Sequence, residues 1–275
     1  MPDTNAPILV ATDLSARSDR AVDRAIALAG QMQCPVTVAH VVETKGRKET
    51  NRAAIEEQLR ETLPDAGRDV RIALLEGSPP EALAQEAEAI SARLIVAGVA
   101  RYNEIRDYFL GTAIDHLVRK AAAPVLVIKQ RARKAYRRII VPVDLSNSSK
   151  PALKLAASLF PEAHITVLHA YDIGFEGSGT PDHVLDETRS QNEAELADFL
   201  ASPELAGLRE ASVETRVVKG GTEACMAEAI DELRPDLVIL GTQGSGGLRL
   251  LTTGSKANSM LSWIEVDTLV VRTGE

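Results

Sequence analysis

With 275 residues, the chain is long enough for two domains of ordinary size, each able to bury its own core. Hydrophobic residues make up 45% and charged residues 25% of the sequence, close to the averages of globular proteins. The formal net charge of −8 argues against a general nucleic-acid-binding protein, which needs a positive surface to neutralise phosphates.

The sequence also bears on the cellular compartment. The first residues lack the basic and apolar regions of a secretory signal, and no apolar run approaches the ~20 residues of a membrane span. Cys34 and Cys225 lie in different halves at unrelated positions, which predicts two free thiols in a reducing compartment. We therefore expect a cytoplasmic protein that binds neither membranes nor nucleic acid.

Short β-branched runs alternate with helical stretches in the first half of the chain. Because the runs are almost continuously apolar, they are typical of strands in a parallel sheet covered on both faces. The alternation predicts a doubly wound α/β fold with right-handed crossovers. The predicted strands are 8–12, 35–42, 69–75, 93–98 and 124–129, and the predicted helices are 16–32, 50–62, 80–91 and 112–122.

A segment rich in Lys and Arg follows, from Lys129 to Arg138. Charged connections of this kind are usually solvated, so we predict a linker here. Contact with an anion or an acidic partner is the alternative.

The same alternation returns in the second half. The predicted strands are 138–143, 164–169, 213–218, 236–241 and 267–272, and the predicted helices are 147–160, 184–201, 222–233 and 255–264. The helix at 184–201 is rich in Glu, Gln and Asp, which favours a solvated face over a partner site.

The two halves also align with one another in four blocks that keep the same order. Since one match could arise by chance but four in order could not, the chain is a tandem duplication. We predict domains at 1–133 and 134–275. The aligned blocks are Ile8–Ser15 with Ile139–Ser146, Val36–His40 with Ile165–His169, Leu94–Gly98 with Leu237–Gly241, and Gly111-Thr112 with Gly254-Ser255.

A glycine-rich turn in the second half carries the most informative chemistry. It begins at Gly241, where a predicted strand ends, continues through Gln243 and Gly244, and reaches Gly254-Ser255 after nine further residues. Glycines allow backbone N–H groups to approach phosphate oxygens, and the helix that begins at Ser255 adds unpaired N–H groups, a hydroxyl and the nearby Lys256. A flexible loop with an ordinary serine cap is the alternative interpretation.

Asp144 strengthens the phosphate-site interpretation. It follows the first strand of its domain, next to the strand that ends at Gly241, so both should flank one crevice at the carboxyl edge of the sheet. A carboxylate there can accept a hydrogen bond from an adenine amino group or a ribose hydroxyl. A helix cap or first-turn charge is the alternative for Asp144, and the one that we favour for Asp13.

Other candidate sites are weaker. His40 and His169 occupy equivalent strand ends, which predicts a repeated structural hydrogen bond. No histidine spacing fits a metal site, and none places a base next to Ser15 or Ser146. We therefore expect neither a metal site nor a catalytic residue.

At these residues the chain resembles a tandem universal stress protein. Gly241, Gly244, Gly254 and Ser255 match the motif G-x2-G-x9-G-[S/T] of the ATP-binding members at full spacing. The resemblance implies two open parallel five-stranded sheets of the adenine nucleotide α-hydrolase-like type, with strand order 3-2-1-4-5. It further implies an ATP site formed by Pro142, Asp144, Ala170, Leu240, Gly241, Gln243, Gly244, Gly254, Ser255 and Lys256.

The first repeat departs from this motif. Arg101 stands where the second glycine belongs, and the following segment contains Glu104 and Asp107, whereas Asp13 and Gly111-Thr112 are retained. An arginine side chain would occupy phosphate space, and the carboxylates would repel phosphate. We expect that this repeat has lost triphosphate binding and is structural. The alternative is that Arg101 pairs with a phosphate.

The resemblance implies a stress-response regulator that binds ATP, ADP or AMP in its second repeat and signals to an unknown protein partner. Whether Mg²⁺ accompanies the nucleotide is left open, and hydrolysis would be slow at most, since no base is placed for water. The alternatives are a scaffold that binds no nucleotide and an adenylating enzyme, although no separate substrate domain is present. The last strands, 124–129 and 267–272, should pair and mimic a dimer within one chain; a homodimer of such chains is also open.

Overall fold

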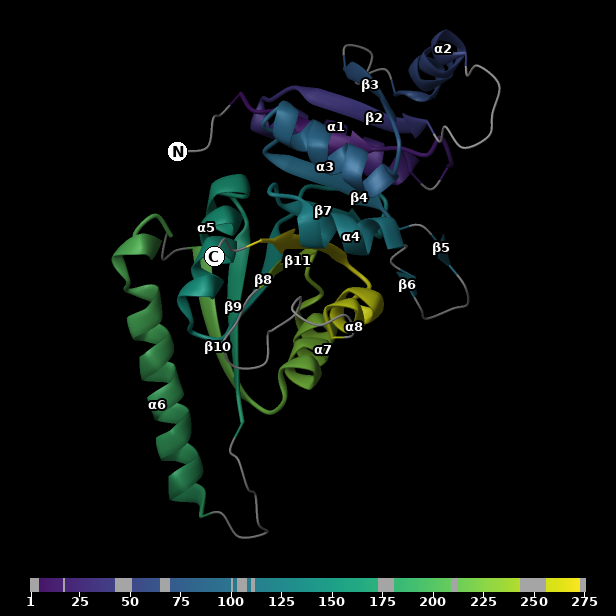
Figure 1. Cartoon of the computed structure of the whole chain (residues 1–275). Helices are drawn as coiled ribbons and strands as arrows, with labels where there is room; N and C mark the ends of the chain where they lie inside the picture. The colour runs from purple at the N-terminus through teal and green to yellow at the C-terminus, as the bar shows by residue number, and fades with distance from the viewer. Residues whose placement is uncertain are drawn as a thin grey trace. The chain divides into compact units, whose positions relative to one another are not determined.

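A computed structural model describes residues 5–16, 18–42, 51–64, 70–99, 101–102, 108–109, 112–172, 181–208, 212–242 and 256–272. The chain divides into two compact units (Figure 1). The first unit contains Met1–Ala135 and Leu261–Arg272, and the second contains Tyr136–Met260 and Thr273–Glu275.

The first unit is built on a sheet in the strand order β3-β2-β1-β4-β7-β12. The first five of these strands are parallel, as expected when helices connect them. Helix α1 packs along β1, β2, β4 and β7, while α3 packs against α4. The elements are β1 (Ile8–Ala11), α1 (Asp19–Met32), β2 (Val36–Val42), α2 (Arg52–Thr62), β3 (Arg71–Glu76), α3 (Pro79–Ala89), β4 (Leu94–Gly98), α4 (Thr112–Lys120), β7 (Val125–Ile128) and β12 (Asp267–Val271).

The core of this unit follows from the apolar runs of the sequence. Central strands β1 and β4 have helices on both faces, so successive side chains are buried whichever way they point. Leu9 and Ile95 are fully buried, as is Leu126 on β7.

Strand β12 belongs to the second repeat in sequence but pairs with the last strand of the first. It runs antiparallel to β7, with Leu269 opposite Leu126 and Val270 opposite Val125. The predicted pairing of the two last strands is confirmed. It covers the apolar edge that β7 would otherwise expose.

The second unit repeats the arrangement, with the order β10-β9-β8-β11, all parallel. The α/β class and the strand order expected from the sequence are confirmed. Helix α8 passes from this unit into the first at Leu261. The elements are β8 (Arg138–Val143), η2 (Asn147–Ser149), α5 (Lys150–Leu159), β9 (His164–Tyr171), α6 (Asp182–Leu200), η3 (Pro203–Leu205), β10 (Val213–Lys219), α7 (Thr222–Leu233), β11 (Leu237–Gly241) and α8 (Lys256–Trp263).

Most predicted elements match the structure within a few residues, and two differences matter for the site. Helix α1 begins at Asp19 instead of residue 16. The chain before it is held by hydrogen bonds from the Ser15 amide to the Asp13 carboxylate and from the Ser18 amide to the Ser15 carbonyl oxygen. A short antiparallel ribbon, β5 (Arg101–Tyr102) with β6 (Tyr108–Phe109), was not predicted.

The connection between the repeats corrects another prediction. Lys129, expected in a solvated linker, is only 2% exposed, and Tyr136 is buried as well. The rest of the basic segment is largely exposed. Helix α6 is solvated as predicted: it buries only Leu196 and Phe199. Within the described ranges, no helix combines the length and hydropathy needed to cross a membrane.

Candidate functional site

The second repeat brings five of its predicted site residues to the carboxyl edge of one sheet. Val143 lies opposite His169, so Asp144 and Ala170 follow at the same level of neighbouring strands. On the other side of β8, strand β11 reaches its end at Gly241. Pro142 and Leu240 stand one position before the last residues of their strands and are buried. In open α/β sheets this edge is where ligands bind.

The Asp144 carboxylate is held in a turn at this edge. Its Oδ1 accepts hydrogen bonds from the Ser146 amide at 3.1 Å, the Ser146 hydroxyl at 2.6 Å and the Ser149 hydroxyl at 2.6 Å. Leu145 takes the left-handed conformation, with φ of +61°, which lets the chain reverse between Asp144 and Ser146. The turn therefore fixes the direction of the carboxylate. Asp144 is not the cap of the helices that follow, since the N-cap residues of η2 and α5 are Ser146 and Ser149.

Two histidines hold the equivalent strand ends in both repeats. His40 Nδ1 lies 3.0 Å from the carbonyl oxygen of Thr12, and His169 Nδ1 lies 3.1 Å from that of Val143. Both carbonyls belong to the residue immediately before the aspartate. The predicted repeated hydrogen bond is confirmed, and it ties the second strand to the turn at the end of the first.

The glycine-rich turn is only partly described. Strand β11 ends at Gly241, where an added Cβ would stand 3.5 Å from the Ser148 carbonyl oxygen, and α8 begins at Lys256. The side chain of Lys256 is not among those described. Gln243, Gly244, Gly254 and Ser255 lie outside the described residues.

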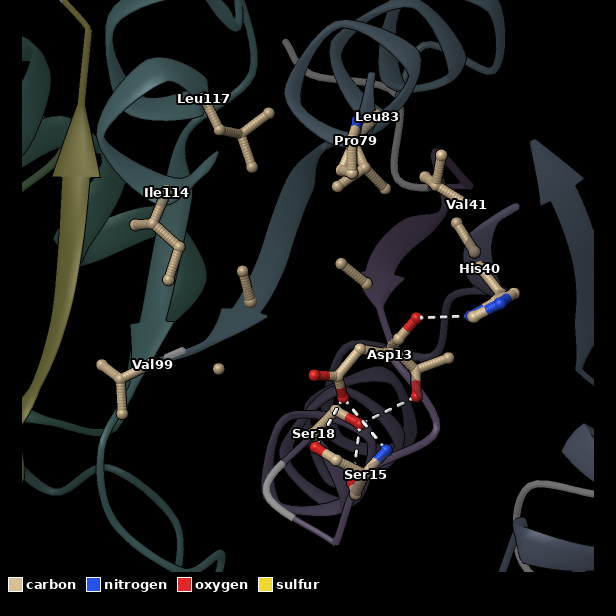
Figure 2. A pocket seen from close by; sticks show the side chains of 15 residues that line it. Asp13, Ser15, Ser18, His40, Val41, Pro79, Leu83, Val99, Ile114 and Leu117 are labelled. Carbon is tan, nitrogen blue, oxygen red and sulfur yellow. Dashed lines mark hydrogen bonds between the residues drawn. The ribbon is translucent and has the colours of Figure 1, made fainter. Parts of the chain in front are cut away.

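The first repeat contains a pocket at the corresponding edge (Figure 2). Its volume is about 220 Å³. Polar groups gather on one side, around the end of β1, while the side chains of α3 and α4 line the other. The lining residues are Ala11, Thr12, Asp13, Ser15, Ser18, Ala39, His40, Val41, Pro79, Leu83, Ala97, Gly98, Val99, Ile114 and Leu117.

Asp13 occupies the same turn as its counterpart in the second repeat. Its Oδ1 accepts from the Ser15 amide at 3.0 Å and the Ser15 hydroxyl at 2.6 Å, and Leu14 has φ of +62°. Partial burial by itself would raise the pKa of Asp13, but hydrogen bonds from Ser15 and Ser18 outweigh it, so the pKa lies below its usual value. The carboxylate is therefore ionised at neutral pH.

Sequence reasoning missed this pocket because it treated the first repeat as structural. The retained Asp13 was one signal. Another was the helical spacing of Pro79 with Leu83 and of Ile114 with Leu117, which places each pair on one helix face. Gly111 lies outside the described residues, and Thr112 begins α4.

The free cysteines show no site chemistry. Cys34 is partly exposed and Cys225 is buried, and burial raises the pKa of the Cys225 thiol. Among the described residues, His, Cys, Asp and Glu side chains form no group of three that could hold a metal ion.

Comparison with known proteins identifies the family. A protein of Mycolicibacterium smegmatis named "Universal stress protein" is 26% identical over 98% of both chains. A solved universal stress protein from Archaeoglobus fulgidus covers 98% of this chain and 99% of its own, with a TM-score of 0.65 and 16% identity. Another, from Archaeoglobus fulgidus in complex with dAMP, covers 46% of this chain and 98% of its own, at 23% identity and a TM-score of 0.37.

The family model described as "Universal stress protein family" matches residues 4–129 and again 135–272, once for each repeat. The two matches together span nearly the whole chain, and each contains one aspartate turn and one strand-end histidine. The chain belongs to the universal stress protein family, with two such domains in tandem.

Proposed function

We propose that this protein is a cytoplasmic stress-response regulator that binds one adenine nucleotide per chain, in the repeat spanning 134–275. The observation that carries the proposal is the course of the backbone around the motif. Strand β11 ends at Gly241, the first motif glycine, and α8 begins at Lys256, directly after the last motif residue, Ser255. The motif thus joins a strand end to a helix start, the context in which such loops bind phosphate.

The residues present fit an adenine nucleotide. The phosphates would take the backbone N–H groups of the motif and of the first turn of α8, where the positive end of the helix dipole lies. The nucleoside would lie in the crevice between Asp144, Ala170 and Leu240, which come from three neighbouring strands. ATP, ADP and AMP share this chemistry. Any Mg²⁺ would be bound through the phosphates.

The first repeat would take no triphosphate. Arg101 replaces the glycine at the second motif position, and its backbone starts β5, the first strand of the ribbon with β6. A regulator with one occupied and one divergent repeat would signal through the occupied state. The role is binding, with slow ATP hydrolysis at most.

Calorimetric titration with ATP, ADP and AMP tests the proposal. The wild type should bind one nucleotide per chain. Gly244→Arg should abolish binding, because it places in the second repeat the residue type found at the same motif position of the first. Gly207→Arg is the matched control: Gly207 is exposed, a Cβ there meets nothing within 4 Å, and affinity should be unchanged.

Three further variants order the contributions. Asp144→Ala should weaken binding roughly ten- to a hundredfold, the value of a hydrogen bond to a charged group. Ser255→Ala should cost less, since the helix N–H groups remain. Asp13→Ala should leave ATP affinity unchanged. Equal affinity of the wild type and Gly244→Arg would refute the phosphate site, and a large effect of Asp13→Ala with a small one of Asp144→Ala would move the site to the first repeat.

A further inference from the structure

We propose that the pocket of the first repeat binds a small organic cation: an ammonium group carried on an apolar body. This ligand differs in charge and class from the nucleotide proposed for the second repeat, and the inference does not depend on that site. It rests on the shape of the pocket, the composition of its wall and the hydrogen bonding of its polar groups (Figure 2).

The size and lining of the pocket suit a compact apolar body. Its volume of about 220 Å³ corresponds to roughly seven water molecules in the liquid, so a ligand of about seven to ten heavy atoms would fill it. Leu83 from α3 and Ile114 and Leu117 from α4 form an aliphatic wall opposite the polar side. Such a wall gains free energy by excluding water and offers a ligand no hydrogen bonds.

The polar side of the pocket is largely occupied by its own hydrogen bonds. The Thr12 hydroxyl lies 2.9 Å from the Ser18 hydroxyl, which donates to the Ser15 carbonyl oxygen at 2.8 Å. His40 Nδ1 is held by the Thr12 carbonyl oxygen. These polar groups already form hydrogen bonds within the protein. A ligand with many polar atoms would have to break those hydrogen bonds to form its own.

Asp13 gives the pocket its charge. It is the one carboxylate among the described lining residues, which include no lysine and no arginine. Both hydrogen bonds from Ser15 end on Oδ1, and Figure 2 shows the other carboxylate oxygen pointing away from them. Asp13 is exposed, so the ammonium group of a ligand can reach its carboxylate while the apolar body lies against the aliphatic wall.

Neighbouring acidic residues reinforce the negative field. Burial, followed by repulsion from Asp23 and Asp13, raises the pKa of Asp19 in the first turn of α1. Asp19 does not line the pocket, but its carboxyl group adds to the acidic groups beside the turn. An anionic ligand such as a nucleotide phosphate would face the same repulsion, whereas an ammonium group would relieve it.

A series of ligands of equal shape separates charge from apolar contact. Benzylamine is a cation at pH 7, benzyl alcohol is neutral, and benzoate is an anion. We expect benzylamine to bind wild-type protein roughly five- to tenfold more tightly than benzyl alcohol in low-salt calorimetric or NMR titrations, the difference between a charged and a neutral hydrogen bond. Benzoate should bind most weakly, and 0.5 M NaCl should reduce the preference for the amine.

Two matched variants locate the binding. Asp13→Asn keeps the shape of the turn and should reduce benzylamine affinity to that of benzyl alcohol. Asp144→Asn makes the same change in the second repeat and should leave benzylamine affinity as in the wild type. Circular dichroism checks the fold of both variants, and the ligand series on the wild type decides the matter even if Asp13→Asn does not fold.

Several results would overturn the proposal. If the wild type binds benzylamine and benzyl alcohol equally well, or if Asp13→Asn binds benzylamine as well as the wild type does, the Asp13 carboxylate does not contribute to binding. Adenosine that displaces benzylamine and binds more tightly would make the pocket a nucleoside site. ATP should not displace benzylamine, because the two ligands bind to different repeats. The benzylamine titration therefore tests the pocket of the first repeat, and the ATP titration separately tests nucleotide binding in the second.

Discussion

Lys129 is a buried amine whose replacement should change how the stability of the protein depends on pH. Its Nζ donates to the carbonyl oxygens of Leu261 at 2.8 Å and Ile264 at 2.6 Å, at the end of α8. The backbone N–H of Lys129 donates to Asp267 Oδ1 at 2.8 Å. Burial lowers the pKa of Lys129 from 10.5 to about 7, although the negative charge of Asp267 raises it in part.

The direction of the effect follows from the two pKa values. Between pH 7 and pH 10.5 the unfolded chain holds a proton on Lys129 that the folded chain has released. The free energy of unfolding therefore rises with pH in this window, by about 1.4 kcal/mol per pH unit. From pH 7.5 to pH 9.0 this group should add about 2 kcal/mol, and the full window corresponds to roughly 5 kcal/mol.

Urea unfolding of the wild type and Lys129→Met, at pH 7.5 and 9.0, measures this difference. The only tryptophan of the chain, Trp263, is the last residue of α8 and lies in the same unit as Lys129, so its fluorescence reports the relevant transition. Lys129→Met leaves two carbonyl groups without their donor, but it also removes the cost of deprotonating a buried amine, so its stability at a single pH is not the test. The decisive result is the change in the free energy of unfolding between pH 7.5 and 9.0, which should be about 2 kcal/mol smaller in the variant than in the wild type.

Lys154→Met serves as the control, because Lys154 is exposed on α5 and its replacement should leave the pH dependence as in the wild type. If the free energy of unfolding of Lys129→Met rises with pH in parallel with that of the wild type, the amine is not held with a lowered pKa and the reasoning fails.

Two further substitutions test interactions inside each unit, one in the first and one in the second, and both are read from urea midpoints. Asp267→Asn should destabilise the first unit by about 3–5 kcal/mol, because it leaves Arg24, 3.4 Å away and equally buried, without its opposite charge. Asp115→Asn, which breaks the partly exposed pair with Arg119, should cost at most about 1 kcal/mol, and equal losses would contradict the argument. Gly220→Ala should cost about 1–3 kcal/mol, since Gly220 has φ of +139° and a Cβ would stand 3.2 Å from Cys225 Sγ. Gly207→Ala, where a Cβ meets nothing within 4 Å, should be close to neutral, and a similar loss there would remove the strain explanation.

Local patterns in the sequence determined much of this protein. The apolar runs of β1 and β4 read as buried parallel strands because each is covered on both faces, which removes the alternation seen in half-exposed strands. The duplication then predicted that His40 and His169 make equivalent hydrogen bonds. In the structure, each lies within hydrogen-bond distance of the carbonyl oxygen of the residue before an aspartate. The spacing from Gly241 to Ser255 likewise joins a strand end to a helix start.

The tertiary structure decided what depends on residues far apart in the chain. Lys129 lies in a basic segment that reads as a solvated linker, and it is buried because β12 and the end of α8, more than 130 residues later, pack over it. The pocket of the first repeat is formed by β1, β2, β4, α3 and α4, and no local pattern shows that their side chains leave a space between them. Periodicity reports which face of an element is covered, whereas the partner that covers it and the gaps that remain are set only when distant elements pack together.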